Sequence, residues 1–231
     1  MGSSQPVVLR VRGILFDMDG VLVSSIGAVE RSWEKWSARH GLDPARAIEA
    51  AHGRRAIETI RLLRPDLNDQ EELAWLEEME MEDKAGLEML HGVCPILEAL
   101  PEKFWTVVTS ATERLARARM AHAGVPVPAR IVSADMVAHG KPHPEPYVRG
   151  AALLGVSPAD CLVIEDSASG AQAGRAAGCK VLATLFSHSL ESLIDADWVV
   201  RSLEDVQVRI DGDDLDVRFT PVSREAIAAN I

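Results

Sequence analysis

The segment FDMDGVL, residues 16–22, follows a run of mostly Val, Leu and Ile at residues 7–16 that two arginines interrupt. An apolar run that stops at a polar, glycine-containing turn is typical of a buried strand that leads into a functional loop. We therefore expect one strand over residues 7–16. Asp17 and Asp19 would then lie just beyond the carboxyl end of that strand.

Beyond residue 92, short apolar segments alternate with amphipathic segments. The expected strands span residues 104–108, 131–132, 161–164, 181–185 and 198–200, and the expected helices span residues 113–122, 144–154 and 169–177. Alternation over residues 206–219 around Asp211-Gly212 predicts a hairpin. Strands that alternate with helices predict an α/β fold, with a Rossmann-like parallel sheet core covered by helices on both faces.

Residues 24–91 differ from the rest of the chain, because they contain scattered Gly and Pro and no strand-like run. Four stretches have apolar residues at near-helical spacing, which predicts a small helical bundle inserted after the first strand. The last helix is expected to be long, with inward positions at Leu73, Leu76, Met79, Leu87 and Leu90. The predicted domains are a core of residues 1–23 and 92–231 and an insertion of residues 24–91.

Polar residues follow several of the predicted core strands. The first strand ends at Asp17 and Asp19, and two further strand ends carry Thr109-Ser110 and Glu165-Asp166-Ser167, while Lys141 lies in a nearby loop. In an open parallel sheet, ligands bind at the carboxyl ends of the strands. Crowded acids repel one another unless a cation lies among them, and Mg²⁺ suits one or two carboxylates together with a substrate phosphate. The alternative is that these acids only cap turns and helices.

The full set of motifs resembles the haloacid dehalogenase-like hydrolase superfamily. FDMDGVL at residues 16–22 resembles the first motif of that family, and VVTS at residues 107–110 resembles the second. Lys141 in GKPHPEP resembles the third motif, and VIEDS at residues 163–167 resembles the fourth. The four motifs occur in the family's order and span most of the chain, so the set is far more specific than any one of them.

The resemblance implies a role for each motif residue. Asp17 would be the nucleophile, and Asp19 would protonate the leaving oxygen and then activate water. Thr109 and the backbone at Ser110 would bind phosphoryl oxygens, and Lys141 would neutralise charge. The implied Mg²⁺ ligands are Asp17, the backbone carbonyl of Asp19, Asp166, and Glu165 either directly or through water. An acid at Asp19 fits phosphate esters, whose leaving alkoxide needs a proton.

The helical insertion is similar to a helical C1-type cap, which closes over the site and selects the substrate. Its sequence resembles bacterial sugar and polyol phosphatases, and the chain also resembles glycerol-3-phosphate phosphatases. His52, Arg54 and Arg55 are the candidate substrate-binding residues of this cap, although a turn histidine and a solvated helix start are the alternatives. The family often has Asp-Ser where this chain has Ser24-Ser25.

Other patterns in the cap favour structural roles. The acidic residues at 77, 78, 80, 82 and 83 are expected to form a solvated face, although one of them could accept a substrate hydroxyl. Trp33, Trp36 and Trp75 are expected to pack in the core of the cap.

Composition limits the classes of partner. The formal net charge of −11 argues against nucleic-acid binding and disfavours an anionic membrane surface. The three cysteines have no CxxC spacing and are expected to be reduced, buried thiols, and residues 1–6 lack a signal-peptide pattern, so we expect a cytoplasmic protein. A monomer is a plausible state.

These patterns predict an Mg²⁺-dependent phosphatase for a small phosphorylated sugar, polyol or glycerol, acting through a phospho-aspartate. A phosphomutase with the same motifs is the alternative. A non-catalytic binding protein is disfavoured, because it would have no need of so many clustered carboxylates.

Overall fold

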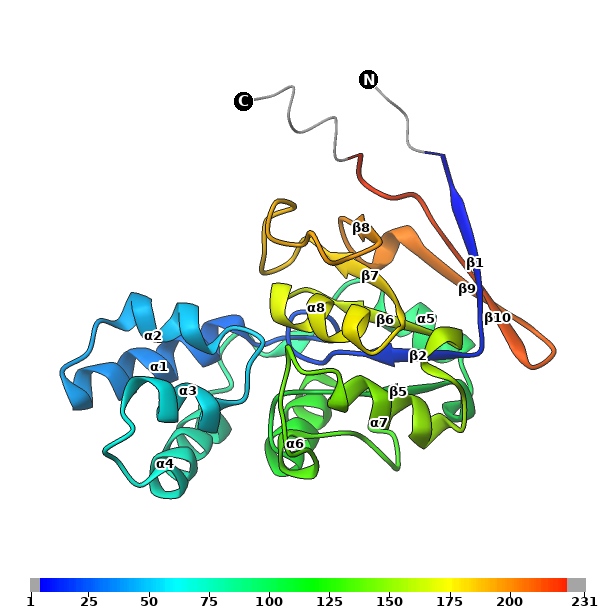
Figure 1. Cartoon of the computed structure of the whole chain (residues 1–231). Coiled ribbons are helices and arrows are strands. Elements are labelled where there is room, and N and C mark those ends of the chain that lie inside the picture. The colour runs from blue at the N-terminus through cyan, green and yellow to red at the C-terminus, as the bar shows by residue number, and fades with distance from the viewer. Residues whose placement is uncertain (1–4, 224–231) are drawn as a thin grey trace.

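The computed structural model describes residues 5–223 of the chain, and its centre is a five-stranded parallel sheet (Figure 1). The strand order is β5 (Trp105–Val107), β2 (Gly13–Phe16), β6 (Cys161–Glu165), β7 (Lys180–Thr184) and β8 (Trp198–Val200). Strand β2 therefore lies between β5 and β6, with Phe16 beside Val107 and Ile164. This register places the ends of β2 and β6 side by side.

Helices cover both faces of the sheet. Successive side chains of a strand point to opposite faces, so one strand contributes to an apolar cluster on each side. Ile14 and Phe16 join an apolar cluster that also includes residues of α5 (Val93–Ala99) and α6 (Glu113–Ala123). Leu15 joins a second cluster with residues of α7 (Glu145–Leu154) and α8 (Ala168–Ala176). The predicted α/β fold with a Rossmann-like core is confirmed.

The first predicted strand is in fact two strands. Residues 7–16 divide into β1 (Val7–Val11) and β2, and β1 pairs antiparallel with β10 (Asp214–Phe219) instead of joining the parallel sheet. The arginines explain the break: Arg10 on the exposed face of β1 pairs with Asp214, and the N–H of Arg12 donates to the carbonyl of Asp160. The hairpin of β9 (Val206–Asp211) and β10 agrees with prediction.

Four helices form a separate cluster to the left of the sheet in Figure 1. They are α1 (Ile26–His40), α2 (Pro44–Ala51), α3 (Ala56–Leu63) and α4 (Asp69–Glu82). Trp33 and Trp36 are buried in their shared core with Ile60 and Leu76, whereas Trp75 packs at its edge. A two-stranded ribbon, β3 (Val23–Ser24) with β4 (Glu88–Met89), joins these helices to the core.

Helix α4 is shorter than predicted. It ends at Glu82, after which Asp83 adopts an extended conformation and Gly86 a left-handed one. Leu87 and Leu90 therefore pack against the core cluster of the sheet and not inside the helical bundle. The division into core and cap near residue 91 stays a prediction.

Smaller differences concern short segments. Residues 131–132 contribute a single bridge, between Val132 and Val108, where a strand was predicted. Cys161 and Cys179 are buried as expected, but Cys94 is exposed, because it lies on the outer face of α5, and all three are free thiols. Four short 3₁₀ helices complete the described elements: η1 (Glu102–Phe104), η2 (Ala134–Met136), η3 (Pro158–Asp160) and η4 (Leu203–Asp205). Among the described residues, no helix is long and apolar enough to cross a bilayer.

Candidate active site

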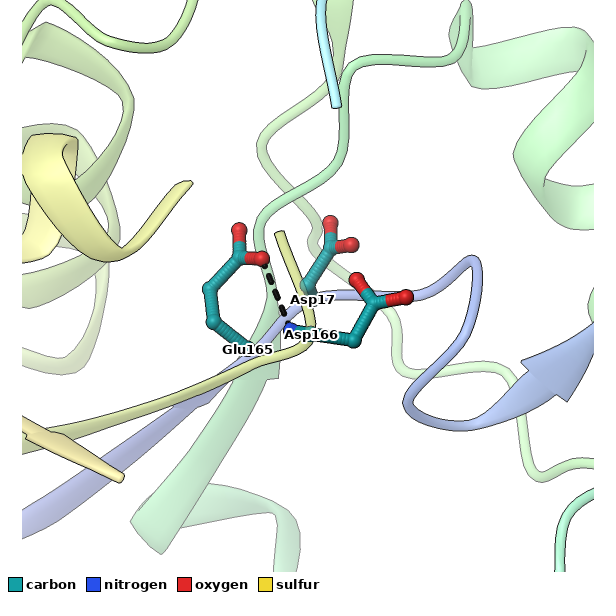
Figure 2. Close-up of side chains that lie close together, drawn as sticks. All are labelled: Asp17, Glu165 and Asp166. Atoms are coloured by element: carbon teal, nitrogen blue, oxygen red, sulfur yellow. Dashed lines mark hydrogen bonds between the residues drawn. The ribbon is translucent and has the colours of Figure 1, made fainter. Parts of the chain in front are cut away.

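Three carboxylates meet at the ends of the neighbouring strands β2 and β6. Asp17 follows β2, Glu165 is the last residue of β6, and Asp166 follows it. Figure 2 shows the three carboxylates close together at the strand ends, and each offers an oxygen within 4.8 Å of the others. All three side chains are buried. Acids at two adjacent strand ends thus form one cluster, as the motifs predict.

Gly20 lets the turn after β2 approach Asp166. Its φ of 79° lies in the left-handed region, and a Cβ atom there would lie 1.8 Å from Oδ2 of Asp166. Any side chain at this position would therefore displace the Asp166 carboxylate. The glycine of FDMDG is a requirement of the acid cluster as well as of the turn.

Lys141 completes the cluster from the loop before α7. Its Nζ donates to Oδ1 of Asp17 and to Oε1 of Glu165, both at 2.6 Å, and its side chain is 1% exposed. Burial lowers the pKa of Lys141, but the two carboxylates outweigh that effect and raise it above its ordinary value. Lys141 is therefore a charged ammonium group fixed beside Asp17.

Glu165 makes more hydrogen bonds than the motif alone suggests. Its Oε1 accepts from Lys141 and from the hydroxyl of Tyr147, and its Oε2 accepts from the N–H groups of Asp166 and Ser167 and from the Ser167 hydroxyl. Burial raises the pKa of Glu165, but Lys141 outweighs this and lowers it. Glu165 thus anchors Lys141, and direct metal binding would compete with these bonds.

Tyr147 is a site residue that the sequence reasoning missed. It is fully buried, and burial together with Glu165 raises the pKa of its hydroxyl well above the ordinary value, so it acts only as a neutral donor. It is the chain's single tyrosine and lies in the GKPHPEPY segment with Lys141. Its position in the same segment as Lys141 was the one sequence feature that could have identified Tyr147 as a site residue.

Asp17 and Asp166, the other two carboxylates of the cluster, both have raised pKa values. Burial raises the pKa of Asp17 to about 7, despite the opposing effect of Lys141. Burial and the nearby Glu165 and Asp17 carboxylates raise the pKa of Asp166 well above its ordinary value. Buried oxygens that resist ionisation without a counter-charge fit a hard divalent cation. Asp17 and Asp166 are the carboxylates best placed to hold it.

Asp19 lies at the same turn, but its side chain contacts other partners. Oδ1 accepts a hydrogen bond of 2.5 Å from the hydroxyl of Ser25, at the start of the cap. Nη1 of Arg119, from α6, donates to both carboxylate oxygens at 2.9 and 3.0 Å. Arg119 belongs to no recognised motif, so no sequence pattern singled it out.

Thr109 and Ser110 follow β5, on the other side of β2. The N–H of Thr109 donates to the carbonyl of Val132, and its Oγ1 accepts from the N–H of Ala111. The Ser110 hydroxyl donates to the carbonyl of Gly53, a cap residue, at 3.0 Å. Both predicted phosphate-binding residues therefore lie at the strand-end edge, and Ser110 also contacts the cap.

A cavity of about 360 Å³ lies between the cap and the core. Its lining includes Asp17, Asp19, Asp166 and Ser110 from the core. Lys141, Thr109 and Glu165 are not part of that lining; Lys141 and Glu165 are fully buried behind Asp17. The cavity thus gives a ligand access to Asp17, while Lys141 acts from the protein interior.

The three candidate cap residues occupy different environments on this cavity. Arg54 is exposed and lines it, and His52 lines it beside His188 with its Nε2 buried and unbonded among the described residues. Arg55 is buried, and all five of its N–H donors are directed at Glu58 and at the carbonyls of residues 134, 137 and 138. A substrate contact by Arg55 would need one of these bonds to break.

The sequence pattern predicted that the acidic run of α4 forms a solvated face. The structure shows that this face is not uniformly solvated. The Glu80 side chain is only 9% exposed, and it accepts from Nη2 of Arg119 and from the hydroxyl of Ser32. Glu77 accepts from the hydroxyl of Thr112 in the core. The face of α4 that carries these acids packs toward α6, so the prediction is wrong for Glu77 and Glu80.

A fold of this kind with acids at two strand ends and a buried lysine between them defines a class of hydrolase. The family model of the haloacid dehalogenase-like hydrolases matches residues 11–178. The chain therefore belongs to this family, and the resemblance noted in the sequence is confirmed.

Individual relatives agree with that assignment. The chain is 39% identical over 205 residues to hexitol phosphatase A of Escherichia coli, covering 87% of this chain and 95% of that protein. It is 32% identical to glycerol-1-phosphate phosphohydrolase 2 of Saccharomyces cerevisiae, covering 89% and 88%. The crystal structure of a β-phosphoglucomutase from Clostridium difficile has a TM-score of 0.73 at 18% identity, covering 85% of this chain and 93% of that chain, which shows the shared fold.

Proposed function

We propose that this protein is an Mg²⁺-dependent phosphatase that hydrolyses a small phosphorylated sugar or polyol through a phospho-aspartate at Asp17. The observation that carries the proposal is the position of Asp17. Its carboxylate is buried against Lys141 and close to Asp166, yet it lines the cavity shared by cap and core. Relatives named as hexitol and glycerol phosphate hydrolases support this class of substrate.

The proposed reaction uses Asp17 as nucleophile and Asp19 as acid and base. An Asp17 oxygen attacks phosphorus, the bond from phosphorus to the ester oxygen breaks, and Asp19 gives its proton to the departing alkoxide. Asp19, now a carboxylate, takes a proton from water as that water attacks the phospho-aspartate. Inorganic phosphate leaves, and Asp17 and the proton on Asp19 are restored.

The other residues bind and orient the phosphate. Lys141 places a positive charge beside Asp17, and Thr109 and the backbone at Ser110 bind phosphoryl oxygens at the neighbouring strand end. Asp17, the backbone carbonyl of Asp19 and Asp166 would hold Mg²⁺, with Glu165 close by. When bound, Mg²⁺ would neutralise charge on the transferring phosphoryl group.

The cavity supports a small substrate. Its volume of about 360 Å³ suits a metabolite, and residues of both the cap and the core line it. His52, Arg54 and Arg55 of the cap all line this space. We propose His52 and Arg54 as direct contacts to substrate, because the donors of Arg55 are already bonded within the protein. Free thiols at three positions support a reducing, cytoplasmic environment, and we propose a monomer.

A phosphate-release screen over sugar, polyol and glycerol phosphates tests the proposal. Mg²⁺ should support turnover of at least one ester, and EDTA should remove it. Asp17→Asn should abolish turnover, because an amide oxygen cannot replace the carboxylate nucleophile, while an unchanged rate in this variant would refute the role of Asp17. Absence of phosphate release from the whole panel would refute the proposed function.

A phosphomutase would use the same motif residues but would pass the phosphoryl group to a second substrate. The two functions are separated by adding a sugar bisphosphate to the assay. Hydrolysis predicts free phosphate without any priming, whereas a mutase predicts that the bisphosphate accelerates turnover and that isomer forms faster than phosphate.

A further inference from the structure

A chain of charged side chains joins the cap to Asp19. Arg119 of α6 donates through Nη1 to both oxygens of Asp19 and through Nη2 to Oε2 of Glu80 in the cap helix α4, at 2.9 Å. Glu80 is fixed in turn by the hydroxyl of Ser32 in α1. The guanidinium group therefore bridges the catalytic turn of the core and two helices of the cap.

The environment of Arg119 makes this bridge more than a surface ion pair. The Arg119 and Glu80 side chains are 3% and 9% exposed. Both residues line the same cavity as Asp19 and Asp17. The Nε of Arg119 is buried without a hydrogen-bond partner among the described residues. Its position is thus set by the two carboxylates, which are the groups that compensate its buried charge.

We propose that Arg119 is a positioning residue that fixes the orientation of the Asp19 carboxylate, and that Glu80 makes this orientation depend on the seating of the cap. The inference rests on the proposed function, in which Asp19 supplies the proton to the leaving oxygen. A donor must lie within hydrogen-bond reach of the atom it protonates. A bridge from cap to Asp19 therefore links proton transfer to a closed, substrate-covered cavity.

A second arginine of the same helix provides a matched control. Arg114 also joins α6 to α4, through Glu77 and Glu78, but its side chain is 56% exposed and has no contact with Asp19 among the described residues. Removing Arg114 therefore breaks a contact between cap and core without changing what surrounds Asp19. Arg114→Met should leave turnover unchanged.

The test uses the dependence of proton donation on the leaving group. An alkoxide leaves only with a proton, whereas p-nitrophenolate leaves without one, so a misplaced Asp19 should slow alkyl phosphates much more than p-nitrophenyl phosphate. The value of kcat/KM reports steps up to the departure of the leaving group, and it is measured for the best alkyl phosphate of the screen and for p-nitrophenyl phosphate. A purely structural defect would lower both values by the same factor.

Arg119→Met should lower kcat/KM for the alkyl phosphate by about 10²-fold and for p-nitrophenyl phosphate by less than about five-fold. Arg119→Lys should recover part of the loss, since it keeps a charge near Asp19. Glu80→Gln should give a smaller loss with the same selectivity and no further loss when combined with Arg119→Met. If Arg119→Met does not fold, the lysine and Glu80 variants carry the same comparison.

Equal losses for the two esters in these variants, or no loss, would overturn the inference while leaving the proposed function intact. A wild-type protein that hydrolyses neither ester would instead refute the proposed function, and the inference with it. Asp17→Asn separates these cases, because it should abolish turnover of both esters equally.

Discussion

Lys141 and Arg119 are both buried cations that hold two carboxylates, but they belong to differently constructed parts of the site. Lys141 binds Asp17 and Glu165, which lie at the ends of the adjacent strands β2 and β6. Arg119 binds Asp19 of the core and Glu80 of the cap. The sheet fixes the first arrangement, whereas the second exists only when the cap packs against α6. The group of Lys141, Asp17 and Glu165, called the chemical centre below, is thus held by the sheet. Its coupling to the cap depends on the interface between α4 and α6.

The largest effect on stability should come from Lys141→Met. It leaves Asp17 and Glu165 buried without their counter-charge, and breaking a buried ion pair by removing one partner costs about 3–5 kcal/mol. We expect that loss in the free energy of unfolding, measured by urea denaturation, and no turnover. Lys103→Met is the control, because Lys103 is 63% exposed, and a surface change should stay within about 0.5 kcal/mol. Similar values for the two variants would contradict this account of the chemical centre.

Metal binding should stabilise the same centre. At ten times its dissociation constant, Mg²⁺ should add about 1.4 kcal/mol to the free energy of unfolding. That corresponds to an increase in Tm of about 3–5 °C for a chain of this size. Asp166→Asn should remove both this increase and most of the turnover, because a ligand is lost. A Tm increase that persists in Asp166→Asn would place the ion elsewhere.

Two neighbouring arginines of the cap, Arg54 and Arg55, have different roles at the interface between cap and core. Arg55 directs all its donors at Glu58 and at three core carbonyls, whereas Arg54 is exposed on the cavity. Arg55→Met should lower the free energy of unfolding by about 2–3 kcal/mol, because buried acceptors lose a charged donor. Arg54→Met should leave stability unchanged and raise KM. A loss of stability in Arg54→Met, or a raised KM with unchanged stability in Arg55→Met, would contradict this assignment of a structural role to Arg55 and a substrate contact to Arg54.

Tyr147→Phe is expected to have a modest effect. The ring stays in place, but Glu165 loses one donor while it keeps Lys141, so the free energy of unfolding should fall by about 1–2 kcal/mol. We expect kcat to fall by a few-fold through a less firmly held Lys141, with KM unchanged. Stability and steady-state kinetics check this, and a variant identical to wild type would show that Tyr147 only fills space.

The proximity of the motif residues could be predicted from the sequence, because the topology of the fold brings strand ends together. Once Asp17, Thr109 and Glu165 are placed after strands of one parallel sheet, their proximity follows from the architecture. Lys141 could be added through its motif. The break at Arg12 was missed, because residues on both sides of it are apolar and only the pairing of β1 with β10 separates them.

The interface could not be predicted in the same way. Arg119 and Glu80 lie far apart in the sequence on two different helices, and each carries the charge expected of a solvated face. Their burial follows from the packing of α4 on α6, which is a tertiary contact that no local pattern encodes. The same holds for Arg55, whose acceptors include the backbone carbonyls of residues 134, 137 and 138.

The central claim is that the phosphoryl group is transferred to Asp17, and trapping that intermediate tests it most directly. Protein mixed with a ³²P-labelled substrate and Mg²⁺ is quenched in acid within a single turnover, then digested and mapped. The account predicts an alkali-labile acyl phosphate on the peptide that contains Asp17, absent from Asp17→Asn. Rapid release of phosphate with no labelled protein, or label on another residue, would contradict it.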